Sequence, residues 1–360
     1  MSRPITLGRE ATYHHTKLFY TPFNSQAAAP PVLTADPWSF LMASLAQKVE
    51  KSRGDNKNRL TKAAYYAAQA EAFYKTGRNS RQPTKATLVY YGMLNLVKCF
   101  LSVRGTDLEM KHEHHGLQIP LGEKLKVQVP GRTKSGVNIF HTFSKEFDVN
   151  PTMELIDVRD ILKHIPELHQ ISFSLGLLPN DQRCFLPVNI DLLTDENEGH
   201  LFSEIRYSKK QDSLVRTSRF LIGERRKYFK DPREENGQII FRCKKRKSFT
   251  WDNLPRIYQN IIKEYSKFDI AMLLTRDGYK YYVDLESPRY HHLCYSLMFM
   301  FYLGTVTRYR PSETQEILSS ELRPAITEAL ATSPNQFLYQ MVGFITGKVC
   351  IVPYSYFDTI

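Results

Sequence analysis

Apolar positions recur at helical spacing through the first third of the chain. Three helices are predicted there, over residues 38–52, 60–74 and 86–103. Asp36 followed by Pro37 is typical of a helix N-terminus, and Gly54 is expected to end the first helix. The third helix is apolar around most of its circumference, which predicts a central buried helix that stops at Gly105.

The pattern changes after residue 125, where apolar and polar residues alternate at strand spacing. Strands are predicted over residues 126–129, 137–140, 170–177, 185–190, 202–207 and 238–242. Helices are predicted over residues 157–164 and 255–265. A β-hairpin is predicted over residues 269–274 and 279–285, because Asp277 and Gly278 between them suit a tight turn.

Helical spacing returns after Pro288. Helices are expected from there to about Tyr309, from near Ser312, and after Pro334. The most apolar run, residues 293–306, is shorter than the roughly 20 residues that span a bilayer, so we expect a core helix of a soluble protein and no membrane partner. The predicted fold class is α+β and predominantly helical, with an N-terminal helical bundle, a β-containing basic middle region and a C-terminal helical unit packing back on the bundle.

The predicted organisation has four parts. They are an extended lead-in (1–35), a helical bundle (36–124), a mixed β-rich region with a basic stretch (125–250), and a hairpin with C-terminal helices (251–360). The apolar and charged fractions, 42% and 24%, are those of a globular chain. The five cysteines lie far apart without a CxxC motif, and no signal-peptide pattern opens the chain, so a cytoplasmic location is expected.

Positive charge is concentrated in one block. The chain has a formal net charge of +12, and residues 205–248 hold fifteen Lys and Arg against five Asp and Glu, an excess of ten. Such a block is expected of a surface that binds a polyanion, or of a solvated insertion. Phe220, Tyr228 and Phe229 lie among the cations, a mixture that suits single-stranded RNA or DNA. The predicted nucleic-acid-binding residues are Arg216, Arg219, Arg225, Arg226, Lys227, Tyr228, Lys230, Lys244, Lys245, Arg246 and Lys247.

Several segments carry a family resemblance. They are Asp36-Pro37-Trp38, the alanine-rich helix at 63–74, LVYYGMLNLVK at 88–98, His115-Gly116-Leu117, ILKHIPEL at 161–168 and YLGTVTRYRP at 302–311. Together they resemble the bacterial YaaC-like family over most of the chain. The resemblance implies a bacterial, cytoplasmic protein and does not imply a particular reaction.

The Tyr-Tyr helix, followed by a lysine, Arg-Gly and His-Gly, is similar to the bundles of the HEPN superfamily. Many members of that superfamily are ribonucleases of toxin or phage-defence systems, and others bind nucleotides or partner proteins. The resemblance implies a homodimer. Its ribonucleases combine an Arg, four to six intervening residues and a His, a pair suited to proton transfer and phosphate stabilisation. Arg159 and His164 fit this spacing, whereas Arg104 and His112 have seven residues between them. Such matches occur by chance, so the sequence leaves open whether the protein is an enzyme.

Other polar groups have structural explanations that we favour over chemical ones. A loop that packs His115 against the bundle is preferred to a metal site at His112, His114 and His115. Arg308 and Arg310 could bind a phosphate, but cations also suit the end of a helix, and the structural role is favoured. No metal or other cofactor is expected. The leading hypothesis is nucleic-acid binding; the alternatives are an interaction module that dimerises or holds a partner protein, and a metal-independent ribonuclease.

Overall fold

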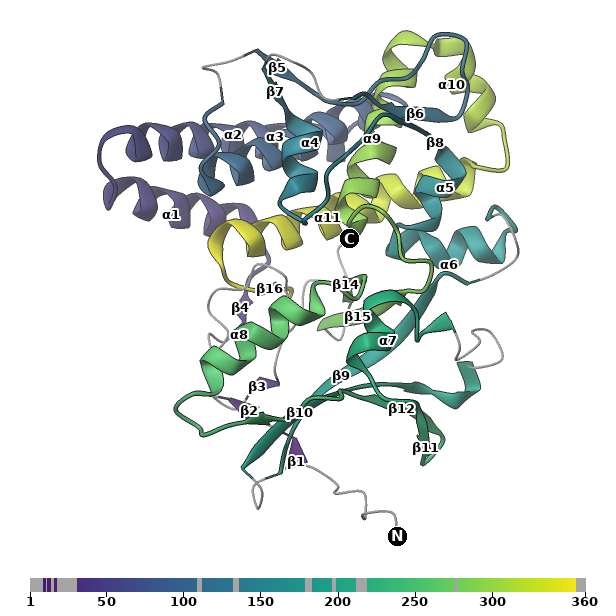
Figure 1. The fold of residues 1–360 in the computed structure, drawn as a ribbon. Coiled ribbons are helices and arrows are strands. Elements are labelled where there is room, and N and C mark those ends of the chain that lie inside the picture. Colours follow the sequence, from purple (N-terminus) through teal and green to yellow (C-terminus); the bar gives the residue numbers. More distant parts are fainter. Residues whose placement is uncertain are drawn as a thin grey trace. The chain divides into compact units, whose positions relative to one another are not determined.

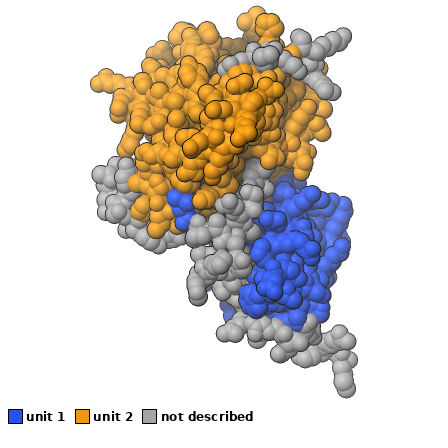
Figure 2. Space-filling model, turned by 90° about the vertical axis from the view of Figure 1, so that its left-hand side faces the viewer, with its two compact units in different colours: residues 1–32, 182–287 blue, residues 33–181, 288–360 orange. Residues whose placement is uncertain are grey.

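The computed structural model describes residues 9–10, 12–13, 16–17, 31–108, 112–131, 136–178, 183–195, 199–211, 219–275 and 278–353. The chain divides into two compact units (Figure 2). Unit 1 contains residues 1–32 and 182–287, and unit 2 contains residues 33–181 and 288–360. Each unit is therefore built from two separate chain segments, which cut across the four ranges expected from the sequence.

Unit 2 is mainly helical. Its helices are α1 (Pro37–Glu50), α2 (Gly54–Arg78), α3 (Thr84–Arg104), α4 (Ile139–Lys145), α5 (Val158–Lys163), α6 (Pro166–Ser174), α9 (His292–Tyr309), α10 (Pro311–Leu318) and α11 (Arg323–Thr346). Helices α2, α9 and α11 pack on α3, so the C-terminal helices return to the N-terminal ones (Figure 1). This arrangement confirms the predicted α+β class with more helix than strand.

Local sequence sets the ends of the first helices. Asp36 caps α1, because its carboxylate accepts a hydrogen bond from the backbone N–H of Trp38 at 3.1 Å. Gly105 ends α3 with a left-handed φ of 111°. Between these ends, Gly92 of α3 lies against Tyr74 of α2. A Cβ at Gly92 would be 2.4 Å from the Tyr74 ring, so glycine permits the two helices to pack this closely.

Helix α3 is the core of unit 2. It has the length and apolar composition of a membrane span, which no other helix in the described ranges has. However, 72% of that apolar window is buried inside the protein. Val97, Cys99 and Phe100 are fully buried. Packing within unit 2 therefore accounts for the apolar composition, and the prediction of a central buried helix is confirmed.

Short strands complete unit 2. They are β4 (Val32–Leu33, at the unit boundary), β5 (Glu113–His114), β6 (Lys126–Val129), β7 (Val137–Asn138), β8 (Glu154–Asp157) and β16 (Cys350–Ile351). The strand predicted over residues 137–140 is wrong beyond β7. Asn138 accepts a hydrogen bond from the backbone N–H of His141 at 2.9 Å and so caps α4 instead. Strand β6 pairs with β8, and β5 pairs in parallel with β7.

Two prolines explain further differences from the sequence prediction. Residues 170–177, predicted as a strand, belong to α6 and the turn after it, because Pro166 suits the first turn of a helix. The last helix begins at Arg323 rather than after Pro334, which lies inside α11. An interior proline costs about 3 kcal/mol, and burial of apolar neighbours such as Leu330 and Phe337 offsets this cost.

In its described residues, unit 1 consists of an antiparallel sheet and two helices. The strands in spatial order are β11 (Arg233–Glu235), β12 (Gln238–Arg242), β10 (His200–Ser208), β9 (Phe185–Asp195), β15 (Gly278–Asp284) and β14 (Ile270–Thr275). Shorter elements are β1 (Arg9–Glu10) on β9, β13 (Lys247–Ser248) on β10, the pair β2 (Thr12–Tyr13) and β3 (Thr16–Lys17), and a 3₁₀ turn (Lys209–Gln211). The helices are α7 (Gly223–Tyr228) and α8 (Leu254–Tyr265). The β14–β15 hairpin is confirmed, although Asp277 of its predicted turn is outside the described residues.

The two faces of this sheet differ. One face carries Phe241, which stacks on Phe220 with ring centroids 4.1 Å apart. Phe220 also contacts Phe229, which in turn meets Tyr265 of α8, so this face is the aromatic core of unit 1. The alternating positions point the other way and carry charged residues, because successive strand side chains lie on opposite faces.

Candidate nucleic-acid interface

Folding neutralises much of the basic block with acids from other parts of the chain. Glu204 on β10 is fully buried and lies opposite Arg242 on β12. Its carboxylate accepts hydrogen bonds from Arg242 at 2.5 Å, from Arg233 at 2.8 Å and from Arg206 at 2.8 Å. Burial acts to raise the pKa of Glu204, but the hydrogen bonds and charges of Arg233 and Arg242 outweigh it and lower that pKa overall. These three arginines therefore form a structural charge network.

Arg225 is a structural residue, which corrects its assignment to a nucleic-acid surface. Its side chain is only 1% exposed. The guanidinium donates hydrogen bonds to the carbonyls of Phe220 (2.9 Å), Phe268 (2.9 Å) and Asp284 (3.0 Å), and to the carboxylate of Asp269 (3.1 Å). A fully enclosed cation with these partners ties α7 to the β14–β15 end of the sheet and cannot meet a phosphate.

Other predicted interface residues are also engaged within unit 1. Arg219 pairs with Glu286 at 3.2 Å and Lys227 with Glu224 at 2.5 Å. Lys247 pairs with Glu264 at 2.9 Å. Tyr228 donates a hydrogen bond to that same carboxylate. Arg216 lies outside the described residues.

The remaining cations form a basic rim, which we define as Arg226, Lys230, Lys244, Lys245 and Arg246. Phe229 and Cys243 form an antiparallel bridge and turn their side chains inward, which leaves Lys230 and Lys244 exposed on either side. The Lys244 ammonium donates to the Arg226 carbonyl at 2.7 Å and so holds α7 beside the end of β12.

An open cavity of about 440 Å³ lies within the rim. Arg226, Lys230 and Lys244 line it, together with Leu221, Phe229 and Asp231. Within the described ranges, the side chains of Arg226, Lys230 and Lys245 are exposed and make no ion pair. The cavity is therefore lined by three cations and one acid, and its surplus positive charge faces solvent.

The aromatic part of the sequence argument needs correction. Phe220 and Phe229 are 0% and 1% exposed, and the Tyr228 ring packs against Phe268, so none of these rings is a free stacking surface. Trp251 is 50% exposed, and its ring meets Phe249 edge-on at 5.5 Å. The sequence analysis missed Trp251. Its position shortly after the basic run ending at Lys247 was the available signal.

The two predicted Arg–His pairs are held by different neighbours. Arg104 pairs with Glu146 at 2.7 Å, while the exposed His112 is placed through its carbonyl, which accepts from Val137. Arg159 pairs with Glu321 at 2.6 Å.

His164, at the end of α5, packs on Tyr295 with ring centroids 4.8 Å apart. Arg159 and His164 are five residues apart, so on a helix their side chains point in directions that differ by roughly 140°. A catalytic role for either pair stays a prediction.

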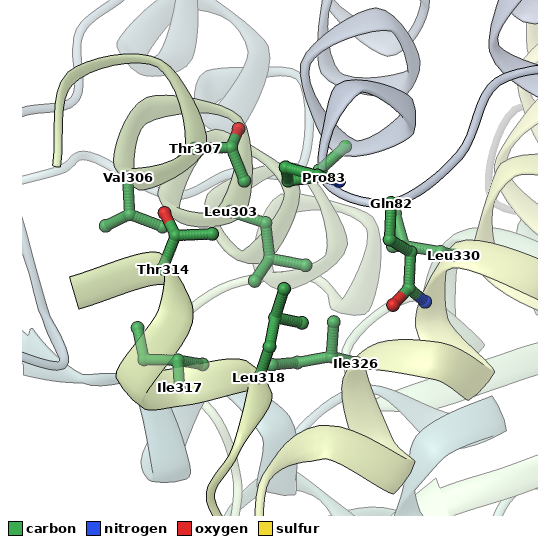
Figure 3. A pocket seen from close by; sticks show the side chains of 11 residues that line it. Gln82, Pro83, Leu303, Val306, Thr307, Thr314, Ile317, Leu318, Ile326 and Leu330 are labelled. Carbon is green, nitrogen blue, oxygen red and sulfur yellow. The ribbon is translucent and has the colours of Figure 1, made fainter. Parts of the chain in front are cut away.

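Unit 2 also contains an apolar pocket between the start of α3 and helices α9, α10 and α11 (Figure 3). Its lining includes Leu303, Leu330 and Ile326, and the interior of about 10 Å³ holds roughly one water molecule. The lining has no ionisable side chain, so this pocket is a packing gap and offers no acid–base chemistry. Among the described residues, no group of three or more His, Cys, Asp or Glu could hold a metal ion.

Comparison with known proteins gives a match to one family model. No match was found among curated proteins or among solved structures. The sequence model of a family described as YaaC-like Protein matches residues 21–345, which is most of the chain. The chain therefore belongs to the YaaC-like protein family.

Proposed function

We propose that this YaaC-like protein binds single-stranded RNA or DNA through the basic rim of unit 1. The observation that carries the proposal is the cavity lined by Arg226, Lys230 and Lys244, with Lys245 beside it in the chain. Exposed cations without acidic partners attract phosphates and release counterions when they bind. In the described part of the block, Glu204 pairs with Arg206, Arg233 and Arg242, and Glu264 pairs with Lys247. Arg226, Lys230 and Lys245 make no ion pair there, so their charge remains available.

The rim favours backbone contacts over base reading. Lysine and arginine contacts to phosphates position a strand without selecting a sequence. Trp251 supplies an exposed ring on which a base can stack, an interaction worth about 1–3 kcal/mol per base. A single strand exposes its phosphates and its base faces at the same time, whereas a duplex hides its base faces.

The test is a fluorescence-anisotropy titration with labelled single-stranded RNA, single-stranded DNA and duplex DNA across a salt series. Four to five phosphate contacts predict a slope of log K against log salt of about −3 for a single strand. The triple variant Arg226→Gln, Lys230→Gln, Lys245→Gln should lose most of the affinity and most of the slope.

A matched control removes the same charge elsewhere. Lys51, Lys57 and Arg78 are exposed cations of unit 2, and their replacement by Gln should leave binding nearly unchanged. Equal losses in both triple variants would show that net charge, not the rim, drives binding. No binding by the wild type at low salt would refute the proposal. Dimerisation, a partner protein and a role in phage defence stay predictions of the sequence resemblance.

A further inference from the structure

Arg308, at the end of α9, has no acidic partner among the described residues although its side chain is half-buried. Its Nε donates to the carbonyl of Gly304 at 3.2 Å, and its Nη1 donates to the hydroxyl of Tyr91. The guanidinium lies over the Tyr91 and Tyr309 rings, with distances of 5.0 and 4.7 Å to their centroids. Over the described ranges of the chain, Arg308 makes no ion pair and its Nη2 has no acceptor.

Arg310 shows what a structural arginine at this place looks like. It pairs with Glu313 at 3.1 Å and donates to the carbonyls of Ile119, Pro120 and Glu123. Both Nη atoms are thus engaged, and three of their four acceptors are carbonyls of the loop before β6, which agrees with the structural role expected from the sequence. Arg308 is only two residues away and keeps donors unused, so the helix end alone does not explain it.

His115 lies beside the same tyrosine pair. Its Nδ1 is hydrogen bonded to the hydroxyl of Tyr90 at 2.9 Å, and its ring centroid is 6.3 Å from that of Tyr91. The expectation that a loop packs His115 against the bundle is therefore confirmed. Burial lowers the pKa of His115, and the charges of Lys98 and Arg308 lower it further. The imidazole thus lies in a positive potential from two different helices.

Lys98 is the second cation of this group. It sits two turns after Tyr91 on α3, on the same side of the helix. Its ammonium pairs with Glu113 at 2.5 Å and lies 5.3 Å from the centre of the Tyr66 ring. With His115 neutral, Lys98, Arg308 and Glu113 sum to one positive charge. If His115 takes up a proton, the sum becomes two, which matches a phosphate dianion.

We propose that Arg308, Tyr91, His115 and Lys98 form a binding site in unit 2 for a phosphate group, either free or as the terminal group of a phosphomonoester. Arg308 anchors the anion through its unused Nη2 donors, since guanidinium and phosphate oxygens form paired hydrogen bonds. Lys98 adds charge, while Tyr91 and Tyr90 hold Arg308 and His115 in place. This site shares no residue with the basic rim, which belongs to unit 1.

Binding should be coupled to protonation of His115. The groups that act on it are Lys98 on α3, Arg308 on α9, Glu113 and His114 in its own loop, and Tyr90 at its Nδ1. A bound dianion raises the pKa of His115, because negative charge stabilises the imidazolium. A phosphomonoester itself loses its second charge at about pH 6, so affinity is calculated for the dianion alone. That affinity is expected to rise as pH falls towards the pKa of His115, and binding of the dianion should take up protons.

The experiment combines calorimetry with NMR on the full chain. Inorganic phosphate, methyl phosphate and acetate are titrated at constant ionic strength into the wild type and into Arg308→Gln. The control is Arg323→Gln, an exposed arginine of unit 2 whose side chain has no hydrogen bond or ion pair within the described residues. Arg308→Gln should weaken phosphate binding about tenfold or more, and Arg323→Gln should not. Acetate binding as tightly as phosphate would overturn the assignment.

The histidine NMR spectrum of the folded wild type provides a measurement that needs no folded Arg308 variant. The His115 signal, assigned with His115→Asn, should shift with phosphate, and the midpoint of its pH titration should move upward. The basic rim shares no residue with this site, so a His115 shift that persists in the variant Arg226→Gln, Lys230→Gln, Lys245→Gln separates the two sites. An unmoved His115 signal at saturating phosphate would refute the proposal. Tighter binding of methyl phosphate than of inorganic phosphate would identify an ester as the source, and binding of inorganic phosphate without methyl phosphate would identify the free ion.

Discussion

Replacing Arg225 by methionine is expected to destabilise unit 1 while leaving nucleic-acid binding by the remaining folded protein intact. Methionine keeps much of the unbranched side chain but removes every donor. The carbonyls of Phe268 and Asp284 then lose the Arg225 donors that lie at 2.9 and 3.0 Å. The Phe220 carbonyl loses its 2.9 Å partner too, but it keeps the backbone N–H of Ile222 at 3.0 Å. Because Arg225 is 1% exposed, water has little access to replace it.

The magnitude follows from these contacts. Each buried acceptor left without a donor costs about 1–3 kcal/mol. The carboxylate of Asp269 is 27% exposed and can be hydrated, so it adds less. Removing the arginine also removes the desolvation cost of its buried charge, which makes the net loss of stability smaller. Loss of one partner of a buried charged pair typically costs about 3–5 kcal/mol, and we expect Arg225→Met to fall in this range.

Urea unfolding followed by tryptophan fluorescence measures this cost. The chain has two tryptophans, the buried Trp38 in unit 2 and Trp251 in unit 1. In a Trp38→Phe background, fluorescence reports on unit 1 alone. Arg226→Met is the matched control, because the adjacent side chain is exposed and should change the unfolding free energy by no more than about 0.5 kcal/mol. A cost below about 1 kcal/mol for Arg225→Met would refute the reasoning.

Three further outcomes are expected. The folded-state pKa of Glu204 is lowered, so this carboxylate contributes stability that is present at neutral pH and lost as pH falls through that pKa. Glu204→Gln should lower the unfolding free energy at pH 7 by about 3–5 kcal/mol. In urea melts at different pH values, the variant should also show a weaker loss of stability on the acid side. In calorimetry, Gly116→Ala should unfold at a clearly lower temperature than Gly176→Ala. Both glycines have a positive φ, but a Cβ at Gly116 would lie 1.8 Å from Asn138, whereas a Cβ at Gly176 would meet open space. The five cysteines are buried, and burial raises the pKa of Cys99 to about 12. A thiol reagent at pH 8 should therefore react slowly with the folded protein, but should react with all five thiols after denaturation. Rapid labelling of the folded protein would contradict this burial.

Much of the fold was readable from the sequence because the signals are local. A capping carboxylate at Asp36, a left-handed glycine at Gly105 and the alternation through β9, β10 and β12 each act within a few residues. The failures at residues 137–140 and 170–177 also have local causes. Asn138 and Pro166 favour helix starts there, and these signals outweigh short stretches of alternation.

The candidate site was only partly predictable. Composition indicated a polyanion surface, and in the described part of the basic block the fold leaves Arg226, Lys230 and Lys245 exposed and without an ion pair. Nothing in the sequence distinguishes Arg226 from Arg225, which occupies the next position in the same short helix and is buried. A turn of about 100° per residue sends the two side chains to different surroundings.

The sequence by itself therefore determined most of the helices and strands, the fold class and the presence of excess positive charge. Only the tertiary structure decided which cations remain available, because neutralisation depends on acids far away in the chain, such as Glu204 for Arg242 and Glu264 for Lys247. The same reason explains Arg308. The packing of α9 on α3 places Arg308 beside Tyr91 and His115 and, among the described residues, away from any carboxylate partner. The spacing of residues along the chain does not predict this packing.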